Sequence, residues 1–301
     1  MEARRQGSRV ITVVALALVT IACPRWAQPM TGTVERKLVV GGVTRSYLLH
    51  AGGPAQPGRP LVLMLHGYGG TAAAMEQRTR GTFDRLADRE GAVVVYPQAL
   101  GDPSHWSAWM VGPADRPGPD DIGFFSALID SLVTELGVDR KRTFAAGFSN
   151  GATMVYRLAC DRPDLVAAVA PISGSIPADV MSICVKNTTP VGIIGMHGTA
   201  DQTVELSAPV RDGVAAWVRR NRCAADPISS RLPDTDPSDG TETRVDVYDQ
   251  CAGGTQVAFY TIEGGGHAWP GGVARLTGGA TSRDFDAAEV IWAFFQRHAR
   301  R

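Results

Sequence analysis

The chain has 301 residues, which is enough to bury a substantial hydrophobic core as one large domain or two small ones. Its 30 Lys and Arg residues equal its 30 Asp and Glu residues, so the formal net charge is zero. Together with the absence of a dense basic cluster in the sequence, this balance argues against a nucleic-acid partner. The composition is otherwise typical of a folded, soluble protein.

The N-terminal segment has the features of an export signal. Arg4, Arg5 and Arg9 precede an apolar run over residues 10–22. This run has the length of a signal-peptide apolar region and is too short to span a bilayer comfortably. We therefore expect residues 1–23 to be a signal peptide and residues 24–33 a linker, with the protein secreted, periplasmic or anchored to the cell envelope.

Two cleavage sites compete within this segment. Thr20-Ile21-Ala22-Cys23 is similar to a bacterial lipoprotein signal, in which Cys23 is lipidated and becomes the mature N-terminus. An ordinary signal peptidase would instead cut near Ala27. We favour the lipoprotein interpretation, and a lipid anchor at Cys23 is the only membrane contact that we expect.

The other four cysteines agree with export. Cys160, Cys184, Cys223 and Cys251 are an even number that suits two disulfides in an oxidising compartment. Three pairings are open, and proximity and element order favour Cys160–Cys184 with Cys223–Cys251. The alternative is four buried free thiols. No Cys-x-x-Cys spacing indicates a metal or redox site, and we expect neither a metal nor a cofactor.

From residue 34 onward, strand-like runs alternate with helical ones. The runs over residues 34–40 and 43–50 are joined by Gly41-Gly42, a hairpin signal. Later runs are apolar throughout, as in strands that are buried on both faces; they lie over residues 61–65, 92–96, 143–148, 165–172, 191–196 and 257–262. Helical stretches are expected over residues 73–89, 121–136, 152–159, 207–220 and 284–298.

Residues 223–251 contain a polar stretch rich in Asp and Pro, which we interpret as a surface excursion tied at its ends by a disulfide. The alternation of apolar strands with helices predicts a mainly parallel sheet covered by helices on both faces, with an antiparallel hairpin at its N-terminal edge. We expect residues 34–301 to form one α/β domain.

The motif Gly147-Phe148-Ser149-Asn150-Gly151 lies between a predicted strand and a predicted helix, the context of a nucleophile elbow. Glycines on both sides let the chain turn sharply and leave the Ser149 hydroxyl exposed above the sheet. A glycine-rich turn that only caps the helix is the alternative.

A serine nucleophile needs a base and an orienting carboxylate. Asp201 follows the run over residues 191–196, and His267 follows the run over residues 257–262. The order Ser149, Asp201, His267 is that of α/β-hydrolases, and loops after strand C-termini are where such a sheet places its site. Alternatively, Asp201 caps the helix that follows it.

Two backbone N–H groups are needed to stabilise the oxyanion. The amide of Asn150 directly follows the nucleophile. For the second donor we nominate the amide of Tyr68, in the loop His66-Gly67-Tyr68-Gly69-Gly70. A simple strand-ending turn would also explain the glycines of this loop.

Three tryptophans are candidates for contact with substrate. Trp269 lies two residues after His267, whereas Trp106 and Trp109 lie in a loop and could equally cover an edge of the core. The pair Asp120-Asp121 is interpreted as helix capping.

Together these motifs resemble the polyhydroxybutyrate depolymerase and feruloyl esterase family. The match includes the loop at residues 66–70, Asp121-Ile122-Gly123-Phe124, the serine motif at 147–151, residues 197–201 and residues 264–271. The resemblance implies an α/β-hydrolase fold and a carboxylic ester hydrolase, with Ser149, Asp201 and His267 at the triad positions. Substrates in this family are polyester oligomers, feruloyl or acetyl groups on plant polysaccharide, or small acyl esters.

We therefore predict an exported serine esterase that acts on a small or oligomeric ester through an acyl-enzyme. A serine peptidase on the same fold, or a non-catalytic binding protein at the cell surface, are the alternatives. The preferred acyl and alcohol groups and the oligomeric state stay open.

Overall fold

The computed structural model describes residues 32–100, 109, 111, 118–184, 186–274 and 279–300. The predicted signal peptide, with Cys23, and Trp106 lie outside the described residues. Within these ranges the strands are β1 (Val34–Val40), β2 (Val43–Ala51), β3 (Arg59–Leu65), β4 (Val93–Pro97), β5 (Val138–Phe148), β6 (Ala168–Ile172), β7 (Gly192–Gly198), β8 (Ile228–Arg231), β9 (Glu242–Tyr248) and β10 (Val257–Glu263). The α-helices are α1 (Ala72–Arg78), α2 (Thr82–Glu90), α3 (Asp121–Leu136), α4 (Asn150–Asp161), α5 (Ala178–Cys184), α6 (Ala208–Arg220) and α7 (Ala287–Arg297).

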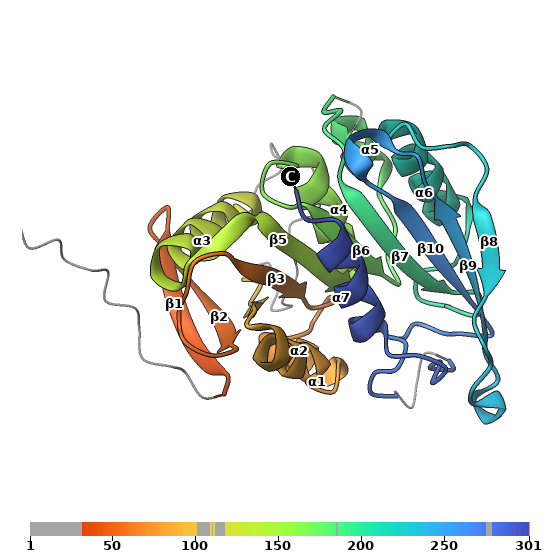
Figure 1. The fold of residues 1–301 in the computed structure, drawn as a ribbon, viewed down its shortest axis with the longest axis horizontal. Coiled ribbons are helices and arrows are strands. Elements are labelled where there is room, and N and C mark those ends of the chain that lie inside the picture. Colours follow the sequence, from red (N-terminus) through yellow and green to blue (C-terminus); the bar gives the residue numbers. More distant parts are fainter. Residues whose placement is uncertain are drawn as a thin grey trace, which may run out of the picture.

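All these strands join one sheet in the order β1-β2-β4-β3-β5-β6-β7-β10-β9-β8 (Figure 1). The pairs from β4 through β10 are parallel. The hairpin β1–β2 is antiparallel and continues antiparallel onto β4. The predicted fold class, a mainly parallel sheet with helices and an N-terminal antiparallel hairpin, is confirmed.

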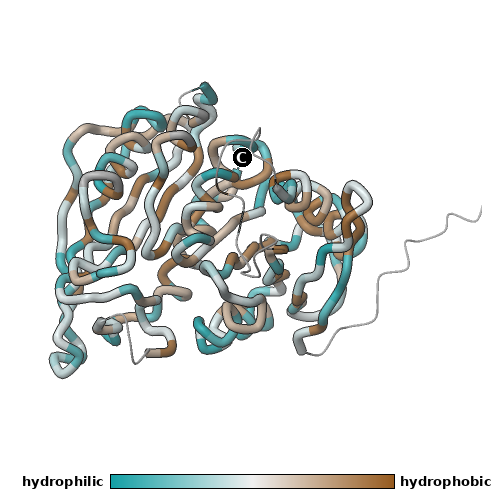
Figure 2. The backbone as a smooth tube through the Cα atoms, turned by 180° about the vertical axis from the view of Figure 1, so that it is seen from behind, coloured by the Kyte–Doolittle hydropathy of each residue, from teal (hydrophilic) through white to brown (hydrophobic). Residues whose placement is uncertain are grey.

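Helices cover both faces because the central strands bury both faces. Along β3, Leu61, Leu63 and Leu65 pack into one core cluster with residues of α3, α4 and α6. Val62 and Met64 point into a second cluster with residues of α1, α2 and α7. Alternation of side chains along a strand produces this division. In the rear view of Figure 2, apolar colour follows the interior of the molecule and polar colour its outer turns.

The segment over residues 223–251 differs from its prediction as a surface excursion. It contains β8 and β9, which extend the sheet antiparallel beyond β10. In β9, Thr243 and Val245 are buried while Glu242 and Arg244 are exposed. Such alternation is the pattern of a strand with one buried face, and the surrounding Asp and Pro residues obscured it.

The stretch over residues 73–89 forms two helices, α1 and α2, where one was expected. Arg80 and Gly81 adopt positive φ values of 55° and 66° and end α1 before α2 begins. Thr79 helps to close α1, because its hydroxyl donates to the carbonyl of Glu76. The helix α5 was not predicted.

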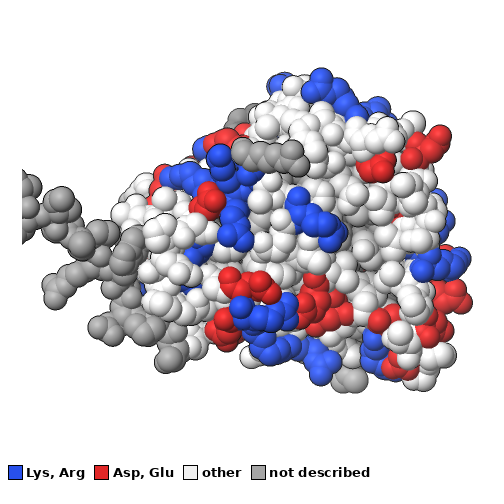
Figure 3. Space-filling view, in the orientation of Figure 1, with Lys and Arg blue, Asp and Glu red and all other residues white. Residues whose placement is uncertain are grey.

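The four cysteines form the disulfides Cys160–Cys184 and Cys223–Cys251, the pairing that element order favours. The first ties α4 to α5, and the second closes the segment that holds β8 and β9. Figure 3 shows Lys and Arg interspersed with Asp and Glu over the visible face, in keeping with a net charge of zero. Among the described helices, none combines the length and the apolar character needed to cross a bilayer.

The adjacent residues Asp120 and Asp121 have different roles. Asp120 caps α3, because its Oδ1 accepts from the backbone N–H of Gly123 at 2.8 Å. Asp121 is buried, and its Oδ1 accepts from Nη2 of Arg45 at 2.6 Å, between β2 and α3. The Arg45 guanidinium also lies over the ring of Phe124 at 4.1 Å. Capping therefore describes Asp120 but not Asp121.

This difference predicts unequal costs on mutation. Asp121→Ala leaves a buried guanidinium without its carboxylate, which costs about 3 to 5 kcal/mol of the free energy of unfolding. Asp120→Ala removes only a helix cap and costs about 1 kcal/mol. Urea denaturation of both variants and the wild type measures the two values, and equal losses would contradict the assignment.

The carboxyl group of Asp84, in the first turn of α2, lies where burial disfavours its charged form. Burial raises the pKa of Asp84 to about 6, against lowering contributions from the Tyr96 hydroxyl, which donates to Asp84 Oδ1 at 2.7 Å, and from the nearby His50. Because the folded state binds this proton more tightly than the unfolded state, the contribution of Asp84 to stability falls as pH rises from about 4 to about 6.

We therefore expect Asp84→Asn to stabilise the protein at pH 7, on the order of 1 kcal/mol, and to lose this advantage at pH 4. Thermal unfolding of both proteins at the two pH values measures the difference. The exposed Asp212→Asn on α6 controls for the loss of one surface carboxylate. A gain that is the same at pH 4 and pH 7 would contradict the assignment.

Candidate active site

The serine motif forms a sharp turn between β5 and α4. Ser149 has φ 56° and ψ −117°, a backbone conformation that L residues rarely adopt. Glycine is required on both sides: a Cβ on Gly147 would lie 2.2 Å from the carbonyl oxygen of Gly151, and one on Gly151 would lie 2.3 Å from that of Leu65. The turn is fixed to the sheet because Ser149 N–H donates to Ile172 O at 2.9 Å.

His267 and Asp201 meet above the neighbouring strands. Nδ1 of His267, in the loop after β10, lies 2.8 Å from Oδ2 of Asp201, in the loop after β7. Both side chains are buried. The loops approach closely, since a Cβ on Gly198 would lie 2.2 Å from the carbonyl oxygen of Gly265. The sequence alternative of Asp201 as a helix cap fails, because α6 begins seven residues later.

Asp201 is held as a carboxylate. Its Oδ1 accepts backbone N–H groups of Thr203 and Val204, each at 2.9 Å. Burial alone would raise the pKa of Asp201, but the hydrogen bond from His267 and these backbone donors outweigh it, so the pKa lies below its ordinary value. Asp201 is therefore ionised at neutral pH and can orient and stabilise a charged imidazole.

His197, on β7, is close to the same carboxylate but has another function. Its Nε2 lies 2.6 Å from the carbonyl oxygen of Val204 and 3.5 Å from Oδ2 of Asp201. The side chain is 1% exposed, and burial lowers its pKa. A buried, neutral imidazole that donates to a backbone carbonyl supports the loop around Asp201 and does not reach the cavity.

Ser149 and His267 line one cavity of about 280 Å³. The remainder of its lining is the loop after β3, one side of α1, and parts of β5 and the loop after β7: His66, Gly67, Tyr68, Gly69, Gly70, Ala74, Met75, Arg78, Phe148 and Thr203. Both loops nominated from the sequence therefore contribute to one space above the carboxyl edge of the sheet.

The loop after β3 is anchored by His66. This residue is 1% exposed, and its Nδ1 lies 2.8 Å from the carbonyl oxygen of Gly67. Its Nε2 accepts from the backbone N–H of Ala99 at 3.2 Å. Desolvation lowers the pKa of His66 despite the hydrogen bond to Gly67, so the ring stays neutral and fixes the start of the loop that carries Tyr68.

The two described tryptophans that were candidates for substrate contact do not line the cavity. Trp109 is buried; its indole N–H donates to the carbonyl of His66 at 2.9 Å, and its backbone N–H donates to Oδ1 of Asn150 at 2.8 Å. It thus braces the loop and the start of α4 without lining the cavity. Trp269 is 1% exposed, packs edge-on against Phe83 in the core, and likewise does not line the cavity. The expectation of a substrate contact by Trp269 is therefore corrected.

Two cavity residues carried no signal in the sequence. Phe148 packs on the ring of His267, with ring centroids 4.8 Å apart. Arg78 lies with its guanidinium 3.9 Å from the centre of the Phe148 ring. Arg78 ends α1, inside a stretch that was predicted as one continuous helix. Only the break after α1 brings it to the cavity.

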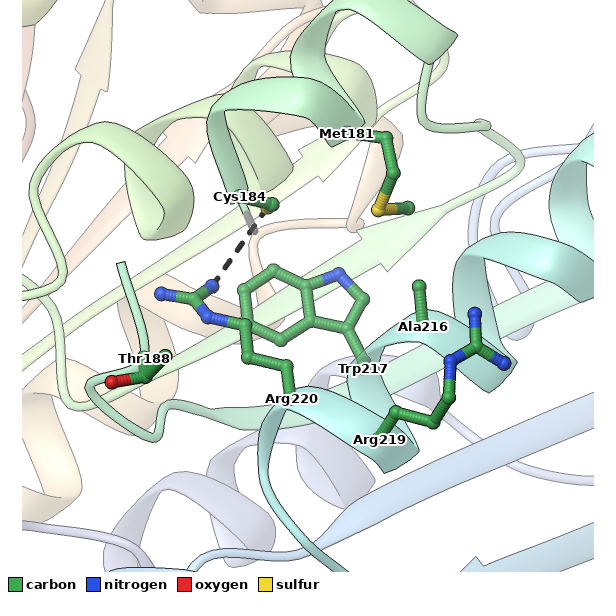
Figure 4. Close-up of a pocket in the computed structure, with 7 residues that line it drawn as sticks. All are labelled: Met181, Cys184, Thr188, Ala216, Trp217, Arg219 and Arg220. Atoms are coloured by element: carbon green, nitrogen blue, oxygen red, sulfur yellow. Dashed lines mark hydrogen bonds between the residues drawn. The ribbon is translucent and has the colours of Figure 1, made fainter. Parts of the chain in front are cut away.

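A second cavity of about 280 Å³ lies between α5 and α6 (Figure 4). There the guanidinium of Arg220 stacks on Trp217 at 4.2 Å, and its Nη1 lies 3.8 Å from Sγ of Cys184. Burial lowers the pKa of Arg220 to about 10, and the side chain donates to the carbonyls of Ala159 and Asn187. Ser149, Asp201 and His267 are absent from its lining, so this cavity is separate from the candidate active site.

Known proteins were compared with this chain in sequence and in structure. The family described as Esterase PHB depolymerase matches residues 45–191. A relative from Nocardia uniformis subsp. tsuyamanensis that bears the name esterase NocK is 34% identical over 290 residues, which cover 87% of this chain and 82% of the relative.

Two fungal relatives are matched over less of their length. Feruloyl esterase B of Piromyces equi is 28% identical over 69% of this chain and 39% of its own. Feruloyl esterase D of Neurospora crassa is 32% identical over 60% of this chain and 56% of its own. The chain thus spans about two fifths to just over half of these relatives.

Among solved structures, acetyl xylan esterase from Aspergillus awamori superposes with a TM-score of 0.63 over 88% of this chain and 99% of its own, at 15% identity. That likeness shows the shared α/β-hydrolase fold. The family match and the identity and coverage of the Nocardia relative confirm the resemblance seen in the motifs. The chain belongs to the Esterase PHB depolymerase family of carboxylic ester hydrolases.

Proposed function

We propose that this protein is a serine esterase in which Ser149 is the nucleophile, His267 the general base and acid, and Asp201 the residue that orients His267. Ser149 Oγ attacks the ester carbonyl and transfers its proton to Nε2 of His267, because Nδ1 is engaged with Asp201. The imidazolium then protonates the departing alkoxide, which leaves an acyl group on Ser149. Water, deprotonated by His267, attacks the acyl carbonyl, and the acid leaves as Ser149 regains its proton.

The oxyanion of both tetrahedral intermediates is proposed to accept the backbone N–H groups of Asn150 and Tyr68. Asn150 is the first residue of α4, where backbone N–H groups lack partners within the helix. Tyr68 lies in the glycine-rich loop that His66 and Trp109 brace. Two such fixed donors stabilise the developing charge by several kcal/mol without reorganisation.

The observation that carries the proposal is the convergence of three loops. The strained Ser149 turn and His267 line the same cavity, and His267 is hydrogen-bonded to a buried carboxylate. A purely structural role could account for any one of these features, but not for all of them at the same cavity. The strained backbone of Ser149 also supports a functional role, because such strain is concentrated at active sites.

The substrate class proposed is a carboxylic ester that is small or oligomeric: a short polyester, a feruloyl or acetyl ester, or a small acyl ester. The names of the two fungal relatives favour feruloyl esters. We also propose that the protein is exported, with residues 1–23 removed and, where the lipoprotein signal is used, a lipid on Cys23. The two disulfides agree with an oxidising compartment. Mass spectrometry of the mature N-terminus distinguishes a lipidated Cys23 from cleavage near Ala27.

A substrate panel tests the activity. Ethyl ferulate, 4-nitrophenyl acetate and a dimer of 3-hydroxybutyrate represent the three ester types, and aminoacyl 4-nitroanilides represent peptidase substrates. We expect turnover of at least one ester and none of the anilides. Turnover of anilides without turnover of esters would contradict the proposal and favour the peptidase.

A further inference from the structure

Arg78 brings a permanent positive charge to the candidate active site. Among the described residues that line the cavity with Ser149 and His267, it is the only Lys or Arg, and no Asp or Glu is present. Asp201 lies behind His267 with its side chain buried. Within the described lining, Arg78 is therefore the group that would attract an anionic part of a bound molecule, to the side of the cavity that α1 forms.

The guanidinium is held against the residue that precedes Ser149. Its carbon lies 3.9 Å from the centre of the Phe148 ring, and Phe148 directly precedes Ser149. The same ring also packs against the imidazole of His267, at 4.8 Å between centroids. Stacking on an aromatic ring fixes the plane of a guanidinium while its N–H groups at the edge can still donate.

The backbone of Arg78 is also fixed. Its carbonyl accepts from the N–H of Val273 at 3.0 Å, in the segment that follows His267. A Cβ on Gly272 would lie 2.5 Å from the same carbonyl oxygen, so the two segments are in tight contact. The end of α1 is thus attached to the same segment that carries His267, and the position of the charge relative to the reacting groups is set by the fold.

We propose that Arg78 is a specificity residue that binds a carboxylate of the substrate, so that the preferred esters carry a free carboxylate a few bonds from the scissile bond. This inference rests on the proposed esterase function. A fork of N–H donors matches a carboxylate with two parallel hydrogen bonds. The carboxylate can belong to the acyl half of the ester or to its alcohol half.

Two matched substrate pairs test the proposal. In the acyl pair, monoethyl glutarate differs from ethyl pentanoate only by a carboxylate in place of a methyl group. In the alcohol pair, 3-acetoxybutanoate differs from sec-butyl acetate in the same way. The readout is the ratio of kcat/KM for the charged and the neutral ester on one enzyme preparation, measured by titration of released acid. A ratio cancels any general loss of activity in a variant.

For the wild type we expect a preference of about tenfold to a hundredfold for the charged ester in at least one pair, and the pair that shows it identifies the half that is bound. Arg78→Met should abolish the preference, and Arg78→Lys, which keeps the charge but not the fork, should retain part of it. Salt at 1 M should reduce the wild-type ratio, because it screens the attraction.

Lys141→Gln provides a matched control, since it also removes one positive charge. Lys141 is exposed on β5, seven residues before Phe148 and roughly 23 Å away along the strand. The ratio of kcat/KM for charged and neutral esters in Lys141→Gln should equal that of the wild type. Equal rates for charged and neutral esters in both pairs, or a preference that survives in Arg78→Met, would overturn the role of Arg78 while leaving the esterase proposal intact. Failure of the wild type to hydrolyse any of the four esters counts against the esterase proposal as well.

Discussion

Replacement of Ser149 with alanine should lower kcat for ester hydrolysis by a factor of about 10⁴ to 10⁶ while leaving the fold intact. The proposed nucleophile is lost, and His267 and Asp201 have no other group to activate, so the residual rate is that of a cavity that only binds and polarises the ester. Alanine is smaller than serine by one oxygen atom and can follow the same backbone path, although φ 56° stays strained.

Steady-state kinetics on the best ester of the panel, together with thermal unfolding, measures this effect. Ser131→Ala provides the matched control, because Ser131 is a surface residue on α3 whose hydroxyl bonds only to Glu135 among the contacts described for it. The control should retain wild-type kcat. A folded Ser149→Ala protein that keeps more than about a tenth of wild-type kcat would exclude Ser149 as the nucleophile.

The substitution Asp201→Asn should lower kcat by about 10⁴, with a smaller change in KM. The amide keeps the shape of the side chain but carries no charge, so the imidazolium that forms in the transition state is no longer stabilised. Asparagine also presents an N–H₂ group where Oδ2 accepts from His267, or where Oδ1 accepts from Thr203 and Val204. Either orientation breaks a hydrogen bond that fixes the imidazole or the loop.

Two other aspartates that lie between Ser149 and His267 in the sequence are natural controls. Asp212 and Asp226 are both exposed, on α6 and just before β8. Asp212→Asn and Asp226→Asn should leave kcat unchanged. If either of them reduced kcat as much as Asp201→Asn, the assignment of the orienting carboxylate would be wrong.

Acid should remove the contribution that ionised Asp201 makes to the stability of the fold. The pKa of Asp201 is below its ordinary value, so the folded state holds the ionised carboxylate more favourably than the unfolded state does. The stability that this ion contributes is present above the ordinary pKa of an aspartate and is lost as pH falls through the lower pKa of the folded state. Asp84 has the opposite effect, because its pKa is raised.

Much of the fold could be predicted because its strongest signals are local. The central strands are apolar on both faces and are separated by helices, which defines a parallel sheet almost without tertiary information. The serine turn could be predicted for the same reason, since a Cβ at position 147 or 151 would lie less than 3 Å from backbone atoms and both positions therefore require glycine.

The errors came where the signal depends on tertiary context. The alternating strand β9 lies among Asp and Pro residues, and it reads as a surface segment until its pairing with β10 is known. Trp269 lies two residues after His267 in sequence, yet the chain turns after His267 and carries the indole into the core beside Phe83. The short distance along the sequence between Trp269 and His267 therefore does not place the indole in the cavity that His267 lines.

Arg78 is the opposite case, a residue that lines the cavity although the sequence did not indicate it. Nothing in its sequence surroundings distinguishes it from other arginines on helices, because its placement depends on the helix break at Arg80 and Gly81 and on the packing of α1 against Phe148. The break could have been predicted from Gly81, because a glycine inside a helical pattern can end the helix, whereas the positive φ of Arg80 leaves no signal in the sequence. A charged residue at a site can therefore be found only when the fold is known.

The central claim is that an acyl group passes through Ser149, and covalent trapping tests it most directly. The full-length mature protein is incubated with an ethyl fluorophosphonate, and the intact mass and the labelled peptide are determined. The account predicts one phosphonyl adduct, located on Ser149, with loss of esterase activity in proportion to labelling and no adduct in Ser149→Ala. An adduct on another residue, or full inactivation without any label on Ser149, would contradict it.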